Sequence, residues 1–128
     1  MKQYATSQRN KPRHEEHNLQ TACVNWFRYQ YPTYGKMLIA VPNGGRRDAI
    51  TGAMLKAEGV LAGVADLILL IPNRRYHSLL IELKTKSGTQ SKAQKEWQQE
   101  VERLGYSKYI LVRSIDEFVN SINDYLRQ

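Results

Sequence analysis

The sequence has little cysteine, no long hydrophobic stretch and no glycine-rich nucleotide-binding motif. Its one cysteine, Cys23, excludes an internal disulfide framework, and the three histidines lack metal-ligand spacing, so a zinc site is not expected. No apolar run approaches the roughly 20 residues that cross a bilayer. Residues 1–16 are too polar for a secretory signal. We therefore expect a cytoplasmic protein with no membrane segment and no nucleotide cofactor.

Acidic residues are the scarcer charged class. Twelve Asp and Glu stand against 19 Lys and Arg, which gives a formal net charge of +7 and a pI near 9.6. Such an excess suits a polyanionic partner, because phosphate contacts release counterions and dominate nucleic-acid affinity. A basic protein that is merely soluble explains the same numbers. The charge alone leaves both interpretations open.

The 128 residues have room for one domain with one hydrophobic core. Residues 1–14 are basic and nearly devoid of apolar side chains, which predicts a flexible arm ahead of a single domain over residues 15–128. Helical periodicity begins near Glu16 and ends around Tyr31-Pro32. The later patterns predict strands at 37–41, 67–71, 76–84 and 109–112, and helices at 46–58, 92–104 and from 115. The fold class is therefore α/β, a mixed sheet flanked by helices with an αβββαβ core.

Two further patterns concern local structure. Ser91 with Gln94, and Ser114 with Glu117, have the spacing of capping boxes at the starts of the last two helices. The segment 67–71 is wholly apolar, which predicts a strand that is buried on both faces.

Two acids lie in apolar strands, and an unpaired buried carboxylate is strongly unfavourable. Asp66 opens the predicted strand at 67–71, and Glu82 lies inside the strand at 76–84. A turn that pairs Ile71 with His77 sets a register in which Asp66 faces Glu82, with Cβ atoms ~4.5–5.5 Å apart. Because side chains alternate along a strand, Lys84 points to the same face as Glu82.

Two facing carboxylates repel each other unless a divalent cation lies between them, and a hard, oxygen-ligated ion such as Mg²⁺ fits that position. With the ammonium of Lys84 nearby, the set suits metal-dependent hydrolysis of a phosphodiester. The plainer alternative is that Asp66 caps the strand and Glu82 pairs with Lys84 or Lys86 on an exposed edge. The meeting of three such residues on one face favours the catalytic interpretation.

The order Gly63-Val64-Ala65-Asp66 and then Ile81-Glu82-Leu83-Lys84, with fifteen residues between Asp66 and Glu82, resembles the PD-(D/E)xK nuclease signature. More narrowly, the chain is similar to the VRR-NUC (virus-type replication-repair nuclease) family over roughly residues 16–126. Ala65 departs from the usual proline, which shapes the backbone and does no chemistry. The resemblance implies a restriction-endonuclease-like fold. It also includes these motifs: Glu16-x-x-x-Gln20, Pro42-Asn43-Gly44-Gly45, Lys56-x-x-Gly59 and Ser91-x-x-Gln94.

The resemblance implies roles for the matching residues. It makes Asp66 and Glu82 metal ligands, with help from the main-chain carbonyl of Leu83, and it makes Lys84 the catalytic lysine. It also adds Glu16 from the first helix to the metal site.

Two of the implied roles have plain alternatives. Gln94 would orient the lysine or the attacking water, but the capping box accounts for a glutamine there equally well. Glu15 is an acid beside Glu16, and only the spacing to Gln20 favours Glu16.

Basic residues around these motifs are candidates for contacts with DNA phosphates: Arg46, Arg47, Lys56, Lys86 and Lys92, with Lys95 beside them. The turn before Arg46 either brings the backbone close to a phosphate or is only a tight turn. Each lysine, taken singly, is also explained as a solvated surface charge.

The combined interpretation is a Mg²⁺-dependent endonuclease that cuts DNA, with Mn²⁺ as a substitute metal. Short members of the resembled family look like Holliday-junction resolvases, so we expect branched DNA as substrate and a homodimer that cuts two strands. The dimer surface is expected on the terminal helices, where Trp26, Ile122 and Tyr125 compete for one core. The alternatives are a non-catalytic nucleic-acid-binding module of the same fold, an RNA nuclease, and an interaction protein whose basic surface is incidental.

Overall fold

The computed structural model describes the backbone of residues 2–42 and 49–128, and the side chains of residues 14–42 and 49–128. Its elements follow the predicted order, with one short 3₁₀ helix added. Across these residues no helix combines the length and the apolar character that a membrane span needs. The elements are α1 (Lys2–Gln30), η1 (Pro32–Met37), β1 (Leu38–Ala40), α2 (Ala49–Ala57), β2 (Leu67–Leu69), β3 (Ser78–Leu83), α3 (Lys92–Leu104), β4 (Ser107–Val112) and α4 (Ile115–Arg127).

The four strands form one mixed sheet in the order β1-β2-β3-β4. The first two pairings are antiparallel, and β4 runs parallel to β3. The β2–β3 register pairs Leu67 with Ile81 and Leu69 with Leu79, which is the predicted register. One step further along the same pairing, Asp66 stands opposite Glu82. The αβββαβ core is confirmed.

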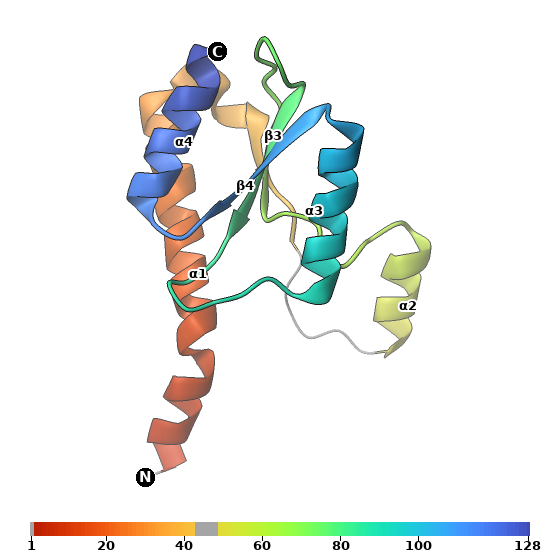
Figure 1. Ribbon diagram of the computed structural model, residues 1–128. Coiled ribbons are helices and arrows are strands. Elements are labelled where there is room, and N and C mark those ends of the chain that lie inside the picture. Colours follow the sequence, from red (N-terminus) through yellow and green to blue (C-terminus); the bar gives the residue numbers. More distant parts are fainter. Residues whose placement is uncertain (1, 43–48) are drawn as a thin grey trace.

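Helices α1 and α4 cover one face of this sheet, and α3 lies against the other face (Figure 1). The first layer encloses the main core, built from one side of all four strands and from the apolar stripes of α1 and α4. Its buried residues are Cys23, Phe27, Leu38, Leu67, Leu69, Leu79, Ile81, Leu83, Val112, Phe118, Ile122 and Tyr125. The burial of this face supplies most of the apolar area removed from water.

The terminal helices do not offer the predicted dimer surface. Ile122 and Tyr125 are buried in the core of their own chain, and the Tyr125 hydroxyl donates to the carbonyl of Ile71 at 2.6 Å. Trp26 packs edge-on against Tyr31 and Phe118. The three side chains fit one core, so that expectation is wrong.

The predicted burial of the second strand on both faces is also wrong. Leu67 and Leu69 point into the main core, whereas Ile68 is half-buried and Leu70 is 50% exposed on the other face. The reason is that α3 packs beside β4 and leaves the β1–β2 part of its face without a helix (Figure 1).

Helix α1 begins at Lys2, so its predicted start near Glu16 is wrong. Residues 2–14 continue the same helix, and this part extends away from the body of the molecule (Figure 1). The low apolar content of residues 1–14 had led us to expect a flexible arm there. Adding turns to an existing helix is far less costly than nucleating one, and the core anchors the later turns of α1.

The ends of the last two helices follow the predicted signals with one difference. Ser91 and Gln94 form a complete capping box, and α3 ends at Gly105 with a left-handed φ of 76°. Ser114 accepts from the amide of Glu117, but the Glu117 carboxylate accepts from the amide of Arg113 rather than that of Ser114. Residues 46–48 of the expected helix start lie outside the described part of the chain.

Candidate active site

Asp66 and Glu82 meet at one end of the β2–β3 pair. Asp66 directly precedes β2, and its Oδ2 accepts the backbone amide of Leu83 at 2.7 Å. Its own carbonyl accepts the amide of Val41 at 2.8 Å, so the antiparallel pairing with the β1 segment continues past the strand end. The Leu83 amide therefore holds the Asp66 carboxylate, and the bond from Val41 fixes the Asp66 backbone.

Glu82 is 1% exposed, so its carboxylate has almost no contact with bulk water. Burial, and then the charge and hydrogen bond of Asp66, raise the pKa of Glu82 to about 8, while Lys84 and Tyr109 oppose this increase. Without a cation, the raised pKa favours the protonated form of the Glu82 carboxyl group. A divalent cation between the oxygens would replace that proton, so the donor set fits a hard metal ion.

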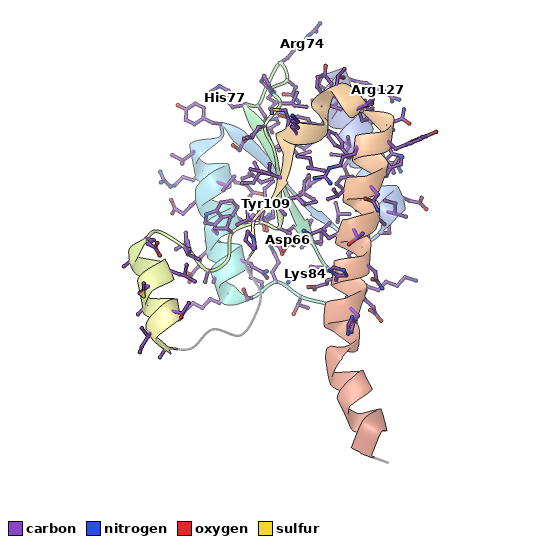
Figure 2. All side chains as sticks on the ribbon, turned by 180° about the vertical axis from the view of Figure 1, so that it is seen from behind. Asp66, Arg74, His77, Lys84, Tyr109 and Arg127 are labelled. Atoms are coloured by element: carbon purple, nitrogen blue, oxygen red, sulfur yellow. The ribbon has the colours of Figure 1, made fainter. Side chains whose placement is uncertain are left out.

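Two side chains hold the Glu82 carboxylate from either side. The Gln94 amide nitrogen donates to Oε1 at 3.0 Å, and the Tyr109 hydroxyl donates to Oε2 over a longer 3.3 Å (Figure 2 labels Tyr109 with Asp66 and Lys84). The Gln94 carbonyl oxygen at the same time accepts the amide of Ser91 at 2.8 Å. Gln94 therefore completes the capping box and also holds the Glu82 carboxylate, while its implied role toward the lysine or the attacking water stays a prediction.

Gly63 lets the loop before Asp66 lie directly on the start of α3. Its φ is 92°, and a Cβ there would lie 2.5 Å from the backbone carbonyl of Ala93 and 2.9 Å from the Gln94 nitrogen. Both the backbone conformation and the close approach require glycine. This contact places Gln94 within reach of the Asp66–Glu82 pair.

Lys84 and Glu16 complete the set of predicted residues at this end of the sheet. Lys84 is buried, and its charge lowers the pKa of both Glu82 and Glu16. The pKa of Glu16 is raised above its ordinary value, first by burial and also by the charge of Asp66. Glu16 and Lys84 therefore lie close enough to the carboxylate pair to act on its charges.

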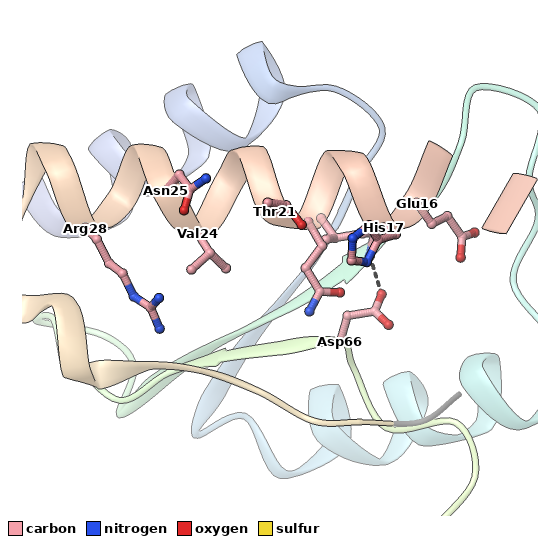
Figure 3. A pocket seen from close by; sticks show the side chains of 9 residues that line it. Glu16, His17, Thr21, Val24, Asn25, Arg28 and Asp66 are labelled. Carbon is pink, nitrogen blue, oxygen red and sulfur yellow. Dashed lines mark hydrogen bonds between the residues drawn. The ribbon is translucent and has the colours of Figure 1, made fainter. Parts of the chain in front are cut away.

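Glu16 and Asp66 line one pocket of about 470 Å³, which lies between α1 and the sheet (Figure 3). The pocket also includes Leu83, whose amide binds Asp66. Across residues 14–42 and 49–128, no three His, Cys, Asp or Glu side chains gather closely enough to form a metal cluster by themselves. Glu16 shares the pocket with Asp66, and its predicted part in the metal site stays a prediction.

The predicted basic contacts are spread more widely. Lys86 is exposed in the loop that follows β3, and Lys92 is 91% exposed with a long 3.9 Å pairing to Glu96. Lys56 is exposed on α2 and lines a different pocket, which Trp97 of α3 also lines. Arg46 and Arg47 lie outside the described residues, as does most of the 42–45 turn.

The loop that holds Lys86 is fixed by a residue that the sequence analysis missed. The Arg113 guanidinium donates to the carbonyls of Thr85 at 2.7 Å, Lys86 at 3.2 Å and Gly88 at 2.7 Å. Arg113 directly follows β4. Because β4 runs parallel to β3 and both strands end at the same edge of the sheet, this position is the one feature of the sequence that could have indicated its contact with the loop.

Tyr109 and Gln90 were missed as well. The Gln90 amide nitrogen donates to the Tyr109 hydroxyl at 3.2 Å and to Gln98 at 2.9 Å, so a polar chain runs behind Glu82 to the surface of α3. Tyr109 looks like an ordinary strand residue in the sequence. Its place on β4, parallel to the strand β3 that holds Glu82, is the one feature that could have indicated its contact with the site.

A mixed sheet with two facing carboxylates, a buried lysine beside them and helices on both faces is the arrangement of a nuclease-type α/β domain. The family model for the VRR-NUC domain matches residues 2–113. Among solved structures, a VRR_NUC domain protein has a TM-score of 0.75 with 28% sequence identity, and the match covers 88% of each chain. No curated protein matches the sequence. The chain belongs to the VRR-NUC family of nucleases, which confirms the predicted resemblance.

Proposed function

We propose that this protein is a metal-dependent endonuclease that hydrolyses phosphodiester bonds in DNA, with Mg²⁺ as its metal and Mn²⁺ as a substitute. The observation that carries the proposal is the pair of facing carboxylates, with Glu82 1% exposed and the buried Lys84 following it on the same strand. A binding module has no use for such a pair, because two carboxylates next to a phosphate backbone weaken its binding.

The residues of the site have distinct roles in this proposal. Asp66, Glu82 and the carbonyl of Leu83 hold the metal, which activates water and balances the negative charge of the transition state when bound. The Lys84 ammonium faces the phosphate oxygens where that charge develops. Gln94 keeps the Glu82 carboxylate in its orientation through the 3.0 Å hydrogen bond. Glu16 adds a further carboxylate to the metal site from α1.

We extend the proposal to branched DNA cut by a homodimer. Resolution of a junction needs two nicks, most simply delivered by two sites related by a two-fold axis. The partly exposed Met37, Ile39 and Leu70 at the β1–β2 edge support association, because apolar side chains gathered on a surface are typical of an interface.

Incubation with linear, forked and four-way-junction DNA, and with RNA of the same sequences, tests the activity with and without Mg²⁺ or Mn²⁺. We expect metal-dependent cleavage of DNA, with paired nicks on the junction. Asp66→Asn should remove cleavage and leave DNA binding intact or tighter, because it removes a metal ligand and a negative charge. Cleavage by this variant at the wild-type rate would reject the site.

Light scattering of the active enzyme at micromolar concentration tests the dimer. We expect a mass near twice 14.8 kDa. A mass near 14.8 kDa with full activity would reject the dimer while leaving the endonuclease in place.

A further inference from the structure

The pocket that holds Asp66 does not end at the catalytic residues. It continues along α1 for a little over three helical turns, from Glu16 to Arg28, and Figure 3 shows these two residues at its opposite ends. At 1.5 Å per residue this corresponds to about 18 Å along the helix axis. The catalytic residues therefore occupy one end of an elongated groove.

The sequence of α1 explains why the groove lies beside the sheet. Glu16, Gln20, Val24 and Arg28 recur every four residues and form one row along the helix. A neighbouring stripe of the same helix, with Cys23 and Phe27, is buried in the main core. A row next to the core stripe lies at the junction between the helix and the sheet, where a groove can form.

The lining of the groove changes in charge from one end to the other. Acidic groups occur at the end with Glu16 and Asp66, and the middle carries the neutral side chains of Gln20, Thr21 and Asn25. Arg28 is the cation at the far end, and it takes part in no ion pair among the described residues. Its side chain runs beside η1, where a Cβ at Gly35 would lie 3.6 Å from its Cγ.

We propose that this groove binds the phosphodiester backbone of the nucleic-acid strand that is cut, with Arg28 as the phosphate contact at its far end. The inference rests on the proposed endonuclease function, which puts the scissile phosphate at the Asp66 end. Arginine suits the other end because its planar guanidinium donates to two phosphate oxygens at once. Neutral donors between them tolerate any base sequence, since they contact the backbone alone.

The length of the groove limits how far from the scissile phosphate Arg28 can make its contact. One strand of B-DNA advances ~3.4 Å along the helix axis per phosphate. A span of about 18 Å therefore places Arg28 at most about five phosphates from the scissile one, on one side only.

Arg28→Gln tests the groove against Arg74→Gln, which removes the same charge from the hairpin turn. Figure 2 shows Arg74 at the end of the molecule away from Asp66 and Lys84. Binding of a labelled DNA duplex is measured by anisotropy in EDTA over a range of salt concentrations. We expect Arg28→Gln to weaken binding several-fold and to reduce the salt slope by about 0.9, the loss of one phosphate contact, while Arg74→Gln leaves both unchanged. Equal slopes for wild type and Arg28→Gln would overturn the proposal.

A second measurement maps the contact with duplexes that carry one neutral methylphosphonate linkage at successive positions. In the wild-type protein, one position within about five phosphates of the cut should weaken binding, and the same substitution should have no effect in Arg28→Gln. Additive losses at every position would overturn the groove even if DNA is cleaved. Conversely, coupling at one position without any cleavage would leave the groove as a binding site and reject the endonuclease, so the two proposals fail separately.

Discussion

The two faces of the sheet differ in what they bury. Among the described residues, the face under α1 and α4 encloses twelve buried core residues without a charged side chain. The face beside α3 encloses only Ala65, Leu80 and Tyr109 as a second cluster, and it carries the buried carboxylate of Glu82. One sheet thus has an apolar face that holds the fold together and another face that carries Glu82, while the groove with Asp66 and Glu16 lies beside α1 next to that apolar core.

Strand alternation produces this division directly. In β3 the residues Leu79, Ile81 and Leu83 point into the main core, and the residues between and after them, Leu80, Glu82 and Lys84, point to the other face. A change on one face should therefore alter stability and a change on the other should alter catalysis. Four substitutions test how far that separation holds.

Phe118→Ala on the apolar face should have the largest effect. The side chain is fully buried and packs edge-on against Trp26 at 5.9 Å between ring centroids. Its removal should lower the free energy of unfolding by about 3–5 kcal/mol, which chemical denaturation would measure. Leu104→Ala, at an exposed position on α3, is the control and should change stability little. Similar losses in the two variants would contradict the assignment of the core.

Lys84→Ala on the polar face should reduce kcat by roughly 10²–10³-fold, with little change in DNA affinity, because its charge acts mainly on the transition state. Lys86→Ala, two residues later in an exposed loop, should instead weaken binding and reduce its salt dependence. Single-turnover cleavage and binding assays would separate the two. If both variants behaved alike, the distinction between the two lysines would be wrong.

Glu82 should make the metal-free protein less stable as the pH rises. Its pKa is raised from an ordinary 4.5 to about 8, so the folded state retains a proton that the unfolded chain releases. That stabilisation is complete below about pH 4.5 and is lost as the pH rises toward 8. Melting curves in EDTA from pH 5 to 9 should show a fall in Tm for wild type that is smaller in Glu82→Gln. Parallel curves would show that the carboxylate is not held in its neutral form.

Tyr109→Phe should have the smallest effect, because its 3.3 Å hydrogen bond to Glu82 is long. We expect metal affinity to fall by about tenfold, the lower end for a group that orients a metal ligand, with little change in Tm. Calorimetric titration with Mn²⁺ would measure it. Tyr106→Phe, at an exposed position beside His77, is the control and should bind the metal as wild type does.

The part of the site that depends on strand register was predictable from the sequence. A turn that pairs Ile71 with His77 implied the pairing of Leu67 with Ile81, and with it the meeting of Asp66 and Glu82. The capping box at Ser91 placed the start of α3 within one residue. These features are local, because each depends on residues that are close in the chain.

The parts that the sequence could not indicate depend on how the layers pack. The half-exposed Leu70 follows from the position of α3 beside β4, which no pattern in β2 reveals. Tyr109 and Arg113 reach the site because β4 runs parallel to β3, so residues about 30 positions apart become neighbours. The groove along α1 exists only once that helix lies on the sheet.

Gln94 links the folding of a helix to the chemistry next to it. A capping box accepts either glutamine or glutamate at this position. Only glutamine can also donate to Glu82, because a glutamate would place a third carboxylate beside two that already repel each other. The capping box of α3 would accept either amino acid at position 94, and the contact with Glu82 favours glutamine. If the first turn of α3 opened, the Gln94 hydrogen bond to Glu82 would be lost with the capping box, so one side chain couples the order of that helix end to the orientation of the carboxylate.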